Sequence, residues 1–177
     1  CFEEGILRNV SVMAPPPALE HAADRLADVD GLCVGVHLTL TSEWDAPSWG
    51  PVLPPEDVPS LVTDDGEFPA DGDAFEALDP RPDDAIAELN AQVGRLRDVG
   101  FDPDYADVHM AVQRRFDWLV VGPPVYDTGD TRGIVGMGRE SGEVAAERVR
   151  QRELFTDERV LAYVADHDVE PIGYDEL

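Results

Sequence analysis

Two histidines of this sequence occupy positions where a polar ring needs a partner. His37 lies inside residues 31–41 (GLCVGVHLTLT), an apolar run with four β-branched residues and neither charge nor proline. Such a run predicts a strand buried on both faces, as in parallel sheets. Because an unsatisfied buried polar group costs about 1–3 kcal/mol, the ring nitrogens of His37 must be bonded. His37 is therefore either a core histidine bonded to a backbone carbonyl, or a metal ligand or catalytic base.

The second histidine, His109, follows Asp107 by two residues in the short predicted strand 105–110 (YADVHM). Alternate residues of a strand project to the same side, so we expect Asp107 and His109 side by side. A carboxylate can orient a metal-binding imidazole, which predicts that Asp107 lies behind a metal site rather than on the ion. The alternative for Asp107 is a residue that caps the end of its strand.

Strands and helices alternate around these residues. Residues 9–13 predict a first strand, residues 18–29 a helix with one apolar face, and residues 31–41 the next strand. A strand–helix–strand unit of this kind usually places its strands parallel. Both histidines then lie near the carboxyl ends of strands, where α/β folds gather their active sites. We expect the two imidazoles to converge on one ion from neighbouring parallel strands.

The remaining periodic segments predict helices that pack on the core. Residues 83–99 form the clearest helix, with Gly100 as its stop signal, and residues 143–154 form another. Thr156 is expected to cap a last helix that ends near residue 166, followed by a short strand at 169–172. The side chains expected to point inward from the first two helices are Ile86, Leu89, Val93, Leu96, Val144, Val149 and Leu154.

Residues 42–82 differ from the rest of the chain. They are rich in proline and acidic residues and contain Trp44 and Trp49. A loop of this length inside a compact domain is usually functional or disordered. Because it starts directly after the strand that carries His37, we interpret it as a lid-like insertion whose tryptophans bind substrate. The alternative is a plain surface insertion.

The charge balance is strongly acidic and limits the choice of partners. The net charge is −25, from 38 acidic residues and 13 basic residues that are all arginine. Nucleic acids and anionic membranes need basic patches, so neither is expected as a partner. No apolar run approaches the roughly 18 residues of a membrane span. We expect a halophilic source, because molar salt screens the mutual repulsion of the acidic residues. We expect a cytoplasmic location, because two cysteines do not suggest a disulfide scaffold.

Five segments, in the same order along the chain, resemble the YdjC-like carbohydrate deacetylases. The segments VGVHLTLT (34–41) and DVHMAV (107–112) are similar to the GxHxxLT and DSHxH strands of that family. Residues 5–28 resemble its GIVTSTSLMV strand and the helix that follows, residues 60–68 (SLVTDDGEF) its SLxDxDGxF loop, and residues 149–177 its C-terminal helices and closing strand. Together these segments cover most of the chain.

The resemblance implies a fold, a cofactor and a substrate. The family has a distorted, TIM-barrel-like (β/α) barrel that removes an N-acetyl group from an amino sugar or chitooligosaccharide, with a divalent metal ion such as Zn²⁺ or Mg²⁺. By motif, His37 and His109 match its two histidine ligands. The family's aspartate ligand and adjacent catalytic base belong to a DDxG strand that we expect before Cys1. Since a (β/α) barrel takes about 250 residues, we expect residues 1–177 to be an incomplete single domain of that type.

Three hypotheses for the function follow. The first is a metal-dependent hydrolase, a carbohydrate deacetylase acting on a small-molecule amino sugar, with a homodimer as the assembly considered. The second is a carbohydrate-binding or regulatory relative that keeps the fold without the chemistry. The third is a hydrolase of another amide or ester. Neither the sugar nor the metal is specified by the residues present.

Overall fold

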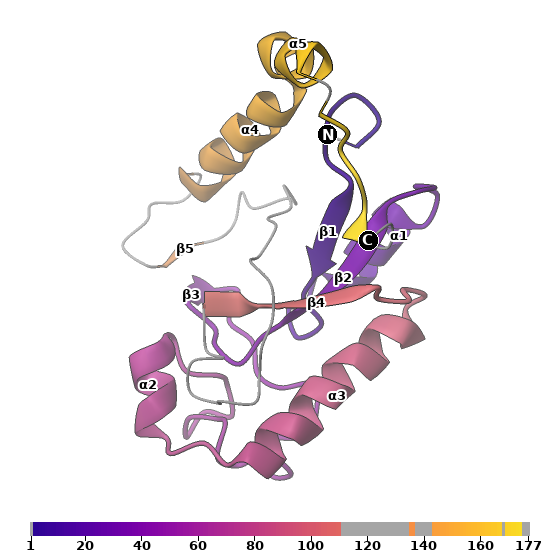
Figure 1. Cartoon of the computed structure of the whole chain (residues 1–177). Coiled ribbons are helices and arrows are strands. Elements are labelled where there is room, and N and C mark those ends of the chain that lie inside the picture. The colour runs from indigo at the N-terminus through magenta and orange to yellow at the C-terminus, as the bar shows by residue number, and fades with distance from the viewer. Residues whose placement is uncertain (1, 111–134, 137–142, 168, 175–177) are drawn as a thin grey trace.

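The structure is a computed structural model that describes residues 2–110, 135–136, 143–167 and 169–174. Across these residues the main sheet has three parallel strands in the order β1-β2-β4 (Figure 1). The strands span Asn9–Val12 (β1), Cys33–Leu38 (β2) and Tyr105–Val108 (β4). Both pairings are parallel, so the prediction of a buried central strand in a parallel sheet is confirmed.

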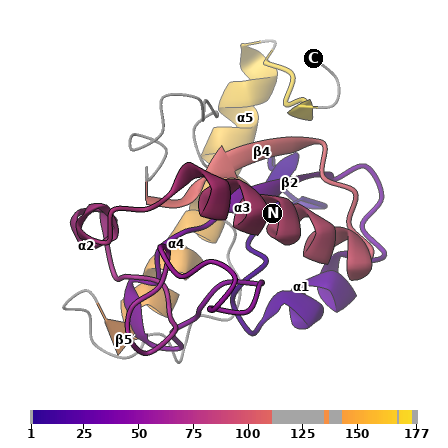
Figure 2. The same ribbon diagram turned by 90° about the horizontal axis from the view of Figure 1, so that it is seen from below.

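Helices connect these strands as the alternation predicts. Helix α1 (Leu19–Leu26) joins β1 to β2, and helix α3 (Pro82–Asp98) precedes β4. The view from below shows α3 running across the sheet beside β2 and β4 (Figure 2). Proline and two acids begin α3, two arginines lie in its last turn, and Gly100 follows at φ +100°. Acids in the first turn and arginines in the last turn interact favourably with the helix dipole, and Gly100 takes the left-handed conformation that ends the helix. Because these signals are local, the sequence pattern predicts this helix.

The chain from residue 42 to residue 82, here called the 42–82 segment, is a folded layer. It contains β3 (Trp44–Ala46) and the short helix α2 (Gly72–Ala77), whose N-cap is Asp71. Strand β3 pairs antiparallel with β5 (Val135–Gly136). Buried side chains of the segment join the hydrophobic core, among them Trp49, Val58, Leu61, Phe68 and Phe75.

Helix α3 holds the 42–82 segment through buried carboxylates. Glu88 is fully buried and accepts hydrogen bonds from the backbone N–H groups of Val52 and Leu53, at 2.9 and 3.0 Å. Burial raises the pKa of Glu88, and the donated hydrogen bonds oppose that rise. Asp84 accepts from the hydroxyl of Ser60 at 2.7 Å. The segment is therefore anchored along the helix rather than attached at its ends alone.

The same contacts correct the predicted inner face of α3. Ile86 is 43% exposed, so its placement in the core was wrong, whereas Leu89 and Leu96 are buried as predicted. Three buried polar side chains recur at four-residue intervals on the inner face: Asp84, Glu88 and Gln92. Because these polar side chains bond to the 42–82 segment and to the end of β2, the helix turns that face inward and Ile86 outward.

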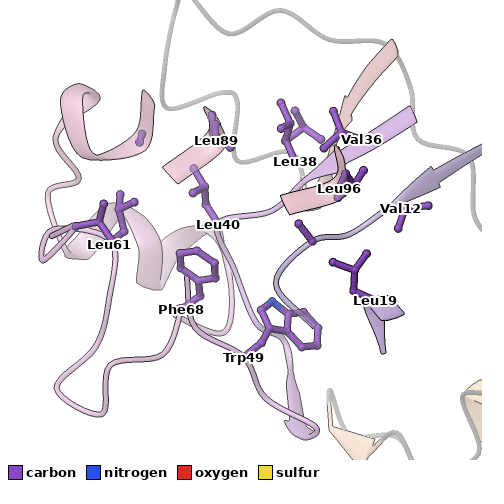
Figure 3. Close-up of a cluster of buried hydrophobic side chains, with 14 of the residues drawn as sticks. Val12, Leu19, Val36, Leu38, Leu40, Trp49, Leu61, Phe68, Leu89 and Leu96 are labelled. Carbon is purple, nitrogen blue, oxygen red and sulfur yellow. The ribbon is translucent and has the colours of Figure 1, made fainter. Parts of the chain in front are cut away.

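The hydrophobic core lies between the sheet, α3 and the 42–82 segment. Figure 3 shows Leu40 and Leu89 near Leu38, with Phe68 and Trp49 on the neighbouring side of the same cluster. Strand β2 contributes to it along most of its length, because five of its six residues are buried. The core therefore packs around the strand that carries His37.

Two helices follow in the C-terminal part. Helix α4 spans Glu143–Thr156 and helix α5 spans Glu158–Asp166, and Figure 1 places both on the opposite side of the sheet from α2 and α3. The cap of α5 is Asp157, which accepts from the N–H of Arg159, and not the predicted Thr156. A carboxylate next to the first helical residue accepts that N–H directly, which explains the shift by one residue.

Other predictions for this part need correction. Val149 and Leu154 of α4 are 53% and 58% exposed, so they do not point into the core. Residues 169–172 run without regular secondary structure where a strand was predicted. The side chain of Val144 lies outside the described residues. No helix in the described part of the chain combines the length and apolar character of a membrane span.

The architecture that the described residues establish is a mixed α/β fold around an open parallel sheet.

Candidate functional site

The site is built on the pairing of β2 with β4. His37 and Asp107 are register partners on these neighbouring strands. The His37 Nδ1 atom lies 2.6 Å from the Asp107 Oδ1 atom, and the two residues are 7% and 1% exposed. An ionised carboxylate only accepts hydrogen bonds, so in a neutral imidazole His37 donates from Nδ1 and the lone pair lies on Nε2.

His109 follows β4 directly and turns its ring toward His37. Its Nδ1 atom lies 3.2 Å from the Nε2 atom of His37, and the ring centroids are 5.2 Å apart in an edge-on arrangement. Asp107 and His109 lie on one side of the chain, as their two-residue spacing predicts. The predicted placement of two converging histidines near the ends of neighbouring parallel strands is confirmed.

A second carboxylate, which sequence reasoning missed, holds the far side of His109. The Glu43 Oε2 atom lies 2.7 Å from the His109 Nε2 atom, and the Glu43 side chain is 7% exposed. The two residues are 66 positions apart in the chain. Glu43 opens the acidic, tryptophan-bearing segment after β2, and nothing local distinguishes it from the other acids there.

Asp107 is itself held from behind. The hydroxyl of Ser11 on β1 lies 2.8 Å from the Asp107 Oδ2 atom and 3.0 Å from the hydroxyl of Tyr105. Burial raises the pKa of Tyr105 well above its ordinary value, and the nearby charge of Asp107 adds to the rise against the bond to Ser11. Tyr105 therefore keeps its proton and can donate a hydrogen bond to the Ser11 hydroxyl, which donates its own hydrogen bond to Asp107.

These contacts leave two lone pairs facing each other. Each imidazole donates one N–H to its own carboxylate, Asp107 or Glu43, so His37 Nε2 and His109 Nδ1 both present acceptors across 3.2 Å. Two acceptors at this distance repel unless a cation or a shared proton lies between them. Within the part of the chain that the structure describes, no group of three or more His, Cys, Asp or Glu side chains has the arrangement of a complete metal site.

The tryptophans predicted to bind substrate have different surroundings. Trp49 is 6% exposed and packs in the core, where its indole N–H donates to the carbonyl oxygen of Thr41 at 2.9 Å. This burial gives Trp49 a packing role and leaves almost no surface for a sugar ring. Trp44 is half-buried at the start of β3, directly after Glu43. For Trp44, contact with the substrate stays a prediction.

The family model of the YdjC-like proteins matches residues 1–163, and the chain belongs to this family. Curated relatives include a carbohydrate deacetylase of Geobacillus stearothermophilus, 38% identical over 108 residues, which are 61% of this chain and 40% of the relative. A carbohydrate deacetylase of Brevibacillus brevis is 31% identical over 106 residues, covering 60% of this chain and 39% of the relative. The match thus spans about two fifths of the length of these curated relatives.

A solved structure supports the same assignment. An Enterococcus faecalis protein described as a cellobiose-phosphate cleavage protein superimposes with a TM-score of 0.56 at 29% identity. The match covers 63% of this chain and 41% of that protein. The resemblance read from the sequence motifs is therefore confirmed at the level of the family.

Proposed function

We propose that this chain carries two metal ligands of a carbohydrate deacetylase, a hydrolase that removes the N-acetyl group of an amino sugar or chitooligosaccharide. The observation that carries the proposal is the 3.2 Å approach of His37 Nε2 to His109 Nδ1, with a carboxylate on the opposite nitrogen of each ring. Relatives named carbohydrate deacetylase support the substrate class.

The donor set fits a divalent ion. Two bonds of about 2.0–2.1 Å at a tetrahedral angle separate their nitrogens by about 3.3–3.4 Å. The separation of 3.2 Å between His37 Nε2 and His109 Nδ1 is close to that value. Two neutral imidazoles backed by carboxylates also form the usual ligand arrangement of zinc sites. The other coordination positions are left for water, substrate and further protein ligands.

The residues of this chain prepare and hold the ligands. A bound divalent ion would supply Lewis acidity that polarises the acetamide carbonyl and lowers the pKa of a water molecule. Asp107 retains the Nδ1 proton of His37, so that Nε2 stays available. The hydroxyl of Ser11 donates to Asp107 from the far side and is itself hydrogen-bonded to Tyr105, which keeps the Asp107 carboxylate aimed at His37. We assign no catalytic base among the described residues.

The wider setting follows from the same proposal. We propose that the parallel strands form an arc of a (β/α) barrel, whose carboxyl-end rim carries the two histidines. The family resemblance supports a small-molecule sugar substrate, and the count of two cysteines supports a cytoplasmic location. A homodimer remains the assembly that we propose to test by light scattering.

Metal titration of the 177-residue chain tests the site. We expect about one Zn²⁺ per chain by calorimetry, with binding lost in His37→Ala and His109→Ala. His21→Ala is the matched control, because His21 is an exposed histidine on α1. Binding by both ligand variants at wild-type affinity would contradict the site.

The reaction is tested separately by acetate release from a panel of N-acetylated sugars. Release that requires added metal and both histidines supports the deacetylase. Metal binding without hydrolysis of any N-acetylated sugar would favour the binding-protein hypothesis, and hydrolysis of other amides or esters alone would favour the third hypothesis.

A further inference from the structure

Glu43 contacts the site at a position that no motif marked. We propose that Glu43 is a positioning residue: its carboxylate retains the Nε2 proton of His109 and so turns the free Nδ1 lone pair toward His37. The inference rests on the proposed function, because the facing nitrogens are the proposed ligands. It adds to that function a role for the 42–82 segment, which supplies the carboxylate that orients His109.

The geometry gives Glu43 the same relation to His109 that Asp107 has to His37. The Glu43–His109 contact is 2.7 Å and the Asp107–His37 contact is 2.6 Å, and in each case the carboxylate faces the ring nitrogen that points away from the other histidine. Asp107 is 1% exposed and the Glu43 side chain 7%, so water competes little at either contact. Each histidine thus has its own carboxylate partner.

The backbone that carries Glu43 is held in place by three hydrogen bonds. The N–H of Ser42 donates to the carbonyl oxygen of Pro69 at 2.8 Å, and the Ser42 hydroxyl accepts from the N–H of Trp49 at 3.0 Å. The Trp49 indole donates to the Thr41 carbonyl at 2.9 Å. The burial of Trp49 therefore has a consequence for the site, because it fixes the two residues that precede Glu43.

The contact predicts a specific cost when it is removed. Without an acceptor at Nε2, the imidazole of His109 is free to take the other tautomer, which places a proton on Nδ1 where the lone pair is needed. Loss of such a partner typically weakens metal affinity by about 10–100-fold. A side chain of the same length with an amide oxygen can still accept the hydrogen bond from the Nε2–H group.

The first measurement is the Zn²⁺ affinity of the full 177-residue chain by competition with a chelator. We expect Glu43→Ala to bind about 10–100-fold more weakly than wild type, and Glu43→Gln to recover most of that loss. Asp45→Ala is the matched control: Asp45 is an exposed acid two residues along the same segment, and its removal changes the net charge equally. Equal affinities for Glu43→Ala and Asp45→Ala would overturn the proposal.

The second measurement needs no metal and separates this inference from the proposed function. Nitrogen NMR of the metal-free chain reports which ring nitrogen of His109 carries the proton. We expect the Nε2–H form in wild type, in Glu43→Gln and in Asp45→Ala, and its loss in Glu43→Ala. If the wild type binds no metal but shows this pattern, the positioning role stands and the metal assignment fails. An Nε2–H signal unchanged in Glu43→Ala overturns the positioning role whatever the metal result.

Discussion

Replacing Glu88 tests whether hydrogen bonds from α3 anchor the 42–82 segment. Its two carboxylate oxygens accept from the N–H groups of Val52 and Leu53 and from the side-chain amide of Gln92, the last at 2.8 Å. Glu88→Ala leaves these three donors without that acceptor. An unsatisfied buried donor costs about 1–3 kcal/mol, with the lower end for donors that water can reach.

The expected loss for Glu88→Ala is a sum over those donors. Val52 and Leu53 are half-buried and contribute about 1 kcal/mol each, whereas the buried Gln92 amide contributes more. Glu88→Ala also removes the cost of burying a carboxylate, which offsets part of the loss from the three donors. The free energy of unfolding should therefore fall by about 2–4 kcal/mol. Glu88→Gln keeps one acceptor oxygen and should lose about 1–2 kcal/mol.

The contribution of Glu88 to the free energy of unfolding should fall as the pH rises. Burial raises the pKa of Glu88 above its ordinary value of 4.5, so the folded chain binds this proton more tightly than the unfolded chain. The stability linked to it is fully present below pH 4.5 and is lost as the pH rises through the folded pKa. The stability advantage of wild type over Glu88→Gln should therefore shrink as the pH rises above 4.5.

Denaturant unfolding in molar KCl measures these differences. Glu76→Ala and Glu76→Gln are the controls, because Glu76 is an exposed glutamate of α2 with the same charge. Both should lie within about 0.5 kcal/mol of wild type. The anchoring argument is refuted if Glu88→Ala is no less stable than Glu76→Ala, or if the wild-type advantage over Glu88→Gln grows with pH.

Three further outcomes are expected. The melting temperature should rise from dilute buffer to about 1 M KCl, where the Debye length is about 3 Å and the repulsion behind a net charge of −25 is screened; a flat or falling curve contradicts the halophile hypothesis. Trp49→Ala should cost about 3–5 kcal/mol in denaturant unfolding, as for a buried aromatic, whereas Trp44→Ala should mainly raise the KM for an N-acetylated sugar; unchanged kinetics for Trp44→Ala would remove it from the substrate site. Gly35→Ala should cost about 1–3 kcal/mol in thermal unfolding, because the added methyl group would overlap the ring of Tyr105; wild-type stability would show that this ring moves freely.

The sequence pattern predicts those helices and strands whose signals come from residues close together in the chain. The apolar run around His37, the acidic start of α3 with arginines in its last turn, and Gly100 each act through neighbours a few residues away, so pattern alone located β2 and α3. The same local spacing predicted Asp107 and His109 on one side of the chain. The alternation of strands and helices then predicted a parallel sheet with both histidines near strand ends.

The groups that complete the site from distant parts of the chain are visible in the folded structure and not in the sequence pattern. Glu43 meets His109 across 66 residues because β2 and β4 are neighbours, and Glu43 follows β2 while His109 follows β4. Likewise, helical periodicity marked Ile86 as apolar but could not show that the buried face of α3 is the one that bonds to the 42–82 segment. Hydrogen-bond partners of this kind are selected by register and packing between segments far apart in the chain, and neither leaves a local pattern.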